Sequence, residues 1–189
     1  DIVPALGLGA EPPEAGVMDV PPRKLSDHLI TRQLLTRAYL ILGPVQSAVT
    51  MLAFYFYFWT NGYQGQWLDL PDSGQIYLAA TAMAFAGVVV TQIGNLFTQR
   101  ATHRSILKVP LFNNRFIWVG IFSEIIITLA VVYLPFMQRF IGTAAFDPKY
   151  WLFLIVWIPI LPLVDSIYKS FKNRQSSVRE GLTRKGESV

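Results

Sequence analysis

The sequence contains no cysteine and few charged residues. Without cysteine, the chain can form neither a disulfide nor a thiolate metal site. Charged residues make up 15% of the 189 positions, whereas a soluble domain usually carries about a quarter, and 52% of the residues are hydrophobic. The charges are gathered near the start, in one central stretch and in the tail. This distribution leaves long uncharged stretches and predicts a membrane protein.

Several motifs of soluble enzymes and exported proteins are also missing. No phosphate-binding loop ending in Gly-Lys-Ser or Gly-Lys-Thr occurs, and Gly7-Leu8-Gly9 lacks the third glycine of a dinucleotide site. No nucleophile triad can be assembled, and His28 and His103 have no partner ligands at metal spacing. The start has no basic region followed by an apolar core, so it is not a signal peptide. Because the chain begins with Asp1, we expect it to be part of a longer protein.

Four apolar runs are each long enough to cross a hydrocarbon core of about 30 Å. They are Tyr39–Trp59, Ile76–Phe97, Phe116–Leu134 and Tyr150–Ile167. The sequence therefore predicts an all-α membrane protein with four transmembrane helices. Gly43-Pro44 predicts a kink in the first run, and Pro159 with Pro162 predicts a bend in the fourth.

The basic residues predict the orientation of these helices. Lys and Arg gather before the first run, between the second and third runs, and in the tail. Residues 60–75 contain neither, and the stretch between the third and fourth runs has only Arg139 and Lys149. Both termini are therefore expected in the cytoplasm. The net charge of +4 fits this asymmetry and does not indicate a nucleic-acid partner.

These observations divide the chain after residue 37 into two parts. Residues 38–168 form the four-helix bundle, and residues 169–189 form a cytoplasmic tail. Within the tail, residues 173–189 are polar, without apolar periodicity, and are expected to be disordered. Within the bundle, Asp165 precedes Lys169 by four residues, a spacing that indicates a structural ion pair on a helix surface.

Polar side chains within the second and third runs are the candidate functional residues. Glu124 lies well inside its run, and a carboxylate there is costly and usually functional. Thr128 lies one turn further and is a candidate second oxygen ligand. Gln92, Asn95 and Gln99 share one helix face and offer the oxygen ligands that hard cations take. The alternative for all of these residues is hydrogen bonding between helices.

The opening residues carry a resemblance to a known family. Asp1–Ala5, then Glu11–Glu14 and Met18–Arg23, resemble the end of the sixth membrane helix and the following loop of type II P-type cation ATPases. The four apolar runs match the last four helices of those pumps in order, length and orientation. Gly120–Glu124 resembles the start of their ninth helix. By this resemblance, which covers about residues 1–172, residues 1–37 are the end of a truncated membrane helix and a cytoplasmic loop.

The resemblance implies a set of cation ligands. Asp1 falls on the coordinating Asp of the family's sixth helix. Gln92 falls where calcium pumps of the sarcoplasmic reticulum type have a ligand Glu, and Asn95 where sodium–potassium pumps have a ligand Asp. Glu124 falls on an acid that sodium pumps share and those calcium pumps lack. These differences favour a monovalent ion, and sodium, potassium, calcium and protons all stay open.

The family's Asp-Lys-Thr-Gly-Thr phosphorylation motif and nucleotide site do not occur in this sequence. The resemblance thus implies that this part holds no cofactor of its own, while the parent pump uses ATP and Mg. The implied partners are the transported cation, the lipid bilayer and the N-terminal remainder of the pump, in the plasma membrane of a prokaryote. The alternative function is that of a self-contained four-helix membrane carrier or scaffold subunit.

Overall fold

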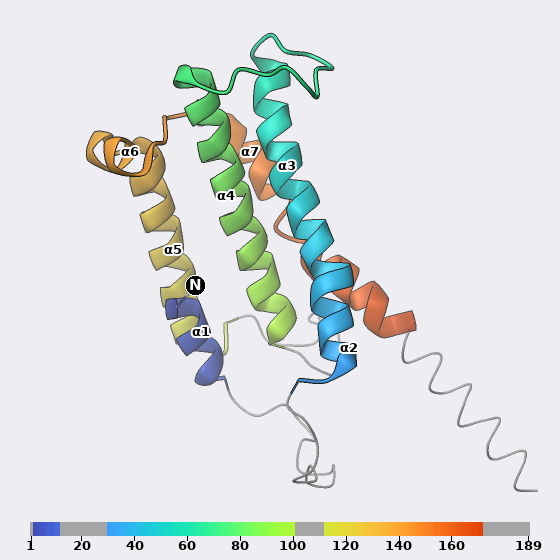
Figure 1. Cartoon of the computed structure of the whole chain (residues 1–189). Coiled ribbons are helices and arrows are strands. Elements are labelled where there is room, and N and C mark those ends of the chain that lie inside the picture. The colour runs from blue at the N-terminus through green and yellow to red at the C-terminus, as the bar shows by residue number, and fades with distance from the viewer. Residues whose placement is uncertain (1, 12–29, 101–111, 172–189) are drawn as a thin grey trace, which may run out of the picture.

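The computed structural model describes residues 2–11, 30–100 and 112–171, and all regular elements in these ranges are helices (Figure 1). The elements are α1 (Ile2–Gly9), α2 (Arg32–Leu35), the π-helix η2 (Thr36–Leu42), α3 (Gly43–Thr60), α4 (Gly74–Gln99), α5 (Arg115–Tyr133), α6 (Pro135–Ile141) and α7 (Tyr150–Ile155). A turn at residues 156–159 separates α7 from a further helix at residues 160–171.

Among the described residues, four helical stretches are long and apolar enough to cross a membrane, which confirms the predicted all-α membrane fold. They are Thr36–Thr60, Gly74–Gln99, Arg115–Tyr133 and Tyr150–Phe171. Their most apolar windows have mean hydropathies between 1.4 and 2.2. The short α1 lies beside the first half of α5 (Figure 1).

Helix α4 occupies the centre of the bundle. More than half of its most apolar window is buried, 56%, against at most 33% for the other three spans. Small residues allow this position, because they let neighbouring backbones approach closely where lipid supplies no drive between helices. At Gly87, an added Cβ would lie 3.3 Å from the Ala53 methyl group of α3. The polar residues of α4 are therefore held by a helix with neighbours on several sides.

The first span contains a π-helix where Gly43-Pro44 predicted a kink. The Gly43 N–H donates to the carbonyl of Ala38, five residues back. Pro44 has no N–H, which is tolerated because it lies in the first turn of α3, where no N–H is needed for the helical ladder. The widened turns of η2 thus lie directly before Gly43-Pro44.

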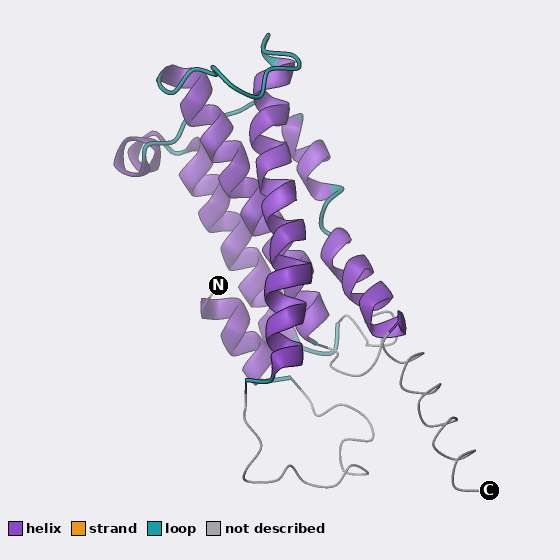
Figure 2. Cartoon of the chain, turned by 45° about the vertical axis from the view of Figure 1, so that its right-hand side comes forward, coloured by secondary structure: helices purple, strands orange, loops and turns teal. Residues whose placement is uncertain are grey.

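The fourth span is broken, as Pro159 and Pro162 predicted (Figure 2). The N–H groups of Trp157 and Ile158 bond only three residues back. Pro162 has no N–H to offer the Ile158 carbonyl. That carbonyl instead lies against Gly94 of α4, so closely that a Cβ on Gly94 would overlap its oxygen. The close contact fixes the broken span to the centre of the bundle.

One helix was not predicted. After α5 the chain turns into α6, which lies beside the end of α5 at the edge of the bundle (Figure 1). It begins with Pro135 and ends at Gly142, whose φ of 77° is a left-handed conformation that glycine adopts without strain. Gln138 ties α6 to α5 by donating from Nε2 to the Val132 carbonyl at 2.6 Å.

Candidate functional site

The amides of α4 form a connected stripe. Asn95 Nδ2 donates to Gln92 Oε1 at 3.4 Å, and Gln99 Nε2 donates to Asn95 Oδ1 at 3.1 Å. These bonds confirm that the three amides share one face. The Thr98 hydroxyl also donates to Asn95 Oδ1, at 3.0 Å. The same hydroxyl lies closer to the Asn95 backbone carbonyl, to which it donates at 2.6 Å. Gln92 and Asn95 are both partly buried.

Glu124 lies on α5, partly buried, one turn after Gly120. The register between α1 and α5 locates it relative to α1. An added Cβ on Gly7 would lie 3.0 Å from Ile117 N, and one on Gly120 would lie 2.8 Å from Pro4 Cα. The two helices run antiparallel, so continuing this register places Ile2 opposite Phe122, and Glu124 lies about half a turn beyond that level. Asp1, the predicted ligand that precedes α1, lies outside the described residues.

Helices α4 and α5 meet through apolar side chains. Ile93 and Leu96 pack with Ile117 and Ile121 in one buried cluster. In the described part of the chain, the hydrogen bonds of Gln92 and Asn95 all stay within α4. The structure thus places the amide pair and Glu124 on adjacent helices and does not link them by a hydrogen bond.

Thr128, the predicted second oxygen ligand, is buried on α5 one turn after Glu124. Its hydroxyl donates to the backbone carbonyl of Glu124 at 2.7 Å, the usual bond of a threonine inside a helix. Its side chain lines an apolar cavity of about 250 Å³ between α4, α5 and α7. Within the described ranges, no group of three or more His, Asp or Glu side chains is arranged to hold a metal ion.

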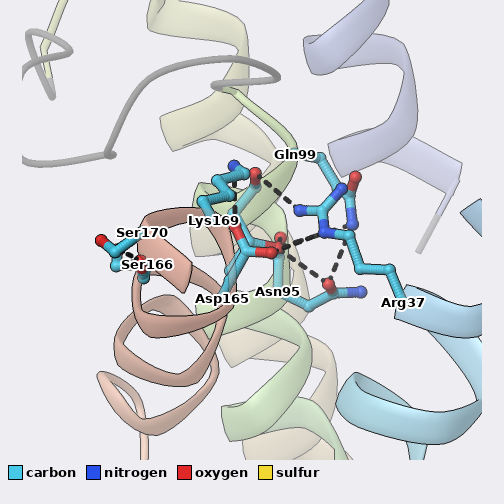
Figure 3. Close-up of polar contacts among 8 residues, drawn as sticks. Arg37, Asn95, Gln99, Asp165, Ser166, Lys169 and Ser170 are labelled. Atoms are coloured by element: carbon cyan, nitrogen blue, oxygen red, sulfur yellow. Dashed lines mark hydrogen bonds and ion pairs between the residues drawn. The ribbon is translucent and has the colours of Figure 1, made fainter. Parts of the chain in front are cut away.

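The Asp165–Lys169 pair is real, but the prediction that it lies on a helix surface is wrong. Asp165 is only 3% exposed and contacts Lys169 Nζ at 2.7 Å and Arg37 Nε of the first span at 2.5 Å. Figure 3 shows Arg37 and Lys169 both reaching the Asp165 carboxylate. Arg37 Nη2 also donates to the Thr98 carbonyl at 3.4 Å. The cluster joins three spans where the Asn95 stripe ends. The only sequence signal for it was an acid inside an apolar run, which needs a buried partner.

The fold and these polar positions define an integral, multi-pass membrane segment with oxygen-bearing side chains inside its central helices. Comparison with protein families assigns the segment to a class. The family described as "Cation transporting ATPase, C-terminus" matches residues 1–171, and the chain therefore belongs to that family.

Individual relatives agree with this assignment. The chain is 29% identical to the "Potassium-transporting ATPase alpha chain 2" of Oryctolagus cuniculus over 195 residues, which cover 90% of the chain and 18% of that protein. It is 31% identical to the "Probable cation-transporting ATPase F" of Mycobacterium tuberculosis, covering 86% of the chain and 16% of the relative. It is 21% identical to the "Calcium-transporting ATPase" of Plasmodium falciparum, covering 93% and 17%. The chain thus spans less than a fifth of these relatives.

Proposed function

We propose that this chain works as the C-terminal membrane part of an ATP-driven cation pump, to which it contributes part of the intramembrane cation site. The observation that carries the proposal is the position of Glu124, a carboxylate inside an otherwise apolar helix that packs against the amide-bearing α4. A carboxylate at such a position is expensive unless it binds an ion, pairs or takes up a proton.

The proposed ligands are Gln92, Asn95, Glu124 and Asp1. Gln92 Oε1 and Asn95 Oδ1 are neutral oxygens, so this chain supplies charge to the site only through its two acids. A low ligand charge favours a monovalent cation, because divalent ions gain affinity with the number of charged ligands. Sodium, potassium and protons are therefore the preferred candidates, and calcium is the ion to test against them.

In the parent pump, the parts outside this chain would use ATP and Mg to phosphorylate an aspartate and to drive alternating access around the site. This chain would provide one wall of the site and the bundle that supports it. The central position of α4 suits this role, because α3, α5 and the broken fourth span all hold the helix that carries the amides.

The proposed setting is the plasma membrane of a prokaryote, with residues 1–37 and 169–189 in the cytoplasm, apart from the end of the truncated helix, and residues 38–168 as the bundle. The distribution of Lys and Arg supports this orientation. The match to a mycobacterial relative supports a bacterial membrane.

The decisive variant is Glu124→Gln in the full-length pump, since glutamine keeps the shape and the hydrogen-bonding capacity but removes the charge. If the carboxylate binds the cation, the ion concentration for half-maximal ATPase activity rises about tenfold, which corresponds to about 1.4 kcal/mol. The assay is run with sodium, potassium, calcium and a pH series. Asp147→Asn, which neutralises an exposed acid in a loop, is the matched control.

A structural Glu124 predicts the reverse pattern, in which the melting temperature falls and the ion dependence stays the same. Unchanged ion dependence for every cation tested would remove Glu124 from the site. A full-length protein with no cation-stimulated ATPase activity would favour the alternative of a carrier or scaffold subunit.

A further inference from the structure

A second buried ion cluster lies where α1, α4 and α5 meet, and it contains none of the proposed cation ligands. Glu11, two residues after α1, accepts hydrogen bonds through Oε1 from Arg100 Nε at 3.1 Å and Arg100 Nη2 at 2.8 Å. Its other oxygen, Oε2, accepts from Asn114 Nδ2 at 2.8 Å. Arg100 directly follows α4, and Asn114 directly precedes α5. We call these three residues the Glu11 joint.

Burial makes this joint different from an ordinary surface ion pair. The Arg100 side chain is fully buried, Asn114 is 4% exposed and the Glu11 side chain is 17% exposed. A charged group removed from water needs a partner with good geometry, and the two hydrogen bonds that one guanidinium donates to Glu11 Oε1 provide it. The joint is therefore a fixed connection, unlike an exposed pair that exchanges freely with water.

Asn114 connects the joint to the backbones of two helices. Its Nδ2 donates to the carbonyl of Gly7 at 2.8 Å, near the end of α1. Its Oδ1 accepts from Phe116 N at 3.0 Å, and this bond caps the first turn of α5. One side chain thus holds the end of α1 against the beginning of α5.

The connection lies on the part of α1 that leads toward the proposed cation site. From Gly9 to Ile2 the described helix runs for eight residues, about 12 Å, so the connection governs how deeply these residues sit beside α5. By the register that Pro4 and Gly120 define, Ile2 lies opposite Phe122, about half a turn from Glu124. On α4, the amide stripe ends at Gln99, immediately before Arg100.

We infer that Glu11, Arg100 and Asn114 are positioning residues that set the relative depth of α1, α4 and α5, and so bring the cation ligands of the three helices to one level. This inference rests on the proposed function, because it concerns the assembly of that site. The three residues touch no cation themselves. They act through Gln92, Asn95 and Glu124.

The first test measures the position of α1 in the chain itself. Since the protein has no cysteine, Leu6 on α1 and Phe85 on α4, which are 69% and 38% exposed, can be replaced by cysteine and spin-labelled. The distance distribution between the labels is recorded in lipid. In Glu11→Gln the distribution should broaden or shift, and in Asp147→Asn it should match that of the parent protein. An unchanged distribution in Glu11→Gln would overturn the inference.

The second test measures cation dependence in the full-length pump. Glu11→Gln and Arg100→Gln should each raise the ion concentration for half-maximal ATPase activity several-fold, to about tenfold, a change of about 1.4 kcal/mol. The maximal rate at saturating ion should change little. The double variant should lose no more ion affinity than the more strongly affected single variant, because both substitutions break the same connection.

Milder variants cover the case in which Arg100→Gln does not fold. Glu11→Asp and Arg100→Lys keep the charges and should restore part of the ion affinity. Ion dependence equal to that of the parent pump, together with a lowered melting temperature, would show a purely structural joint and overturn the inference. If the labelled chain responds as expected but the parent pump has no cation dependence, the proposed function fails and this assignment to a cation site fails with it.

Discussion

Replacing Gly94 with alanine should push α4 away from the broken fourth span. The new Cβ would overlap the Ile158 carbonyl oxygen, and the next atoms it meets are Ile158 C at 3.3 Å and Pro162 Cδ at 3.4 Å. Two of these atoms belong to the backbone and the third to a proline ring, so no flexible side chain can turn away. Either α4 or the turn at residues 156–159 must move.

The expected loss in the free energy of unfolding depends on which atoms the new Cβ contacts. Overpacking a filled interior costs about 1–3 kcal/mol, and a backbone obstacle places Gly94→Ala at the upper end of this range. At roughly 2–4 °C per kcal/mol for a protein of this size, the melting temperature in detergent should fall by roughly 6–12 °C. Because Gly94 lies between Gln92 and Asn95, the full-length pump should also lose cation affinity.

Gly87→Ala is the matched control on the same helix. Its Cβ would meet the Ala53 methyl group at 3.3 Å and Thr50 Cα at 3.7 Å, contacts that a small adjustment relieves. Its expected cost is below about 1 kcal/mol, since alanine also favours the helix. If Gly94→Ala were as stable as the parent protein, or more stable than Gly87→Ala, the close packing of the fourth span on α4 would be refuted.

Three further predictions concern charges and topology. Asp165→Asn should destabilise the chain by about 3 kcal/mol in thermal unfolding, because it leaves two cationic side chains at a buried position without their shared carboxylate, whereas Asp147→Asn should change little. The pKa of the exposed Asp147 carboxyl lies below its ordinary value of 3.8, because the backbone N–H of Lys149 donates a hydrogen bond to it. The contribution of this carboxylate to stability is complete at neutral pH and is lost as the pH falls below about 4, and NMR titration of the carboxyl group can follow the change. Cysteines at Gly62 and Gly142 should react with an impermeant reagent from outside and one at Ser170 only from inside, and the opposite pattern would refute the proposed orientation.

Periodicity and composition predicted the parts of the structure that depend on nearby residues. The four spans follow from uncharged runs of sufficient length, and the break in the fourth span follows from missing N–H groups at Pro159 and Pro162. The amide stripe follows from helical spacing at Gln92, Asn95 and Gln99. Helix α6 had local signals too, a proline at its start and a glycine after its end, but its seven residues are too few for a periodic pattern.

Contacts between distant residues did not follow from the sequence. Spacing on one helix pairs Asp165 with Lys169 but gives no indication of Arg37, which lies 128 positions away. In the same way Glu11 and Arg100 are 89 positions apart, and each stands outside the helix next to it. Both connections depend on how the helices pack, which side-chain periodicity does not determine. The sequence therefore predicts which polar residues need partners, but not which partners they find.

The polar residues of this bundle fall into two groups, which differ in how deeply they are buried and in whether they have charged partners. Asp165 is almost fully buried and is engaged by Lys169 and by Arg37 of the first span, so replacing it should first affect folding. Asn95 and Gln92 are partly buried, neutral, and bonded only within their own helix in the described part of the chain. Losing such bonds costs only about 1 kcal/mol each, so stability alone does not require amides in the middle of an apolar span. A role in holding a cation gives them a physical reason to be there, and substitutions at Asn95 should accordingly change ion affinity more than the melting temperature.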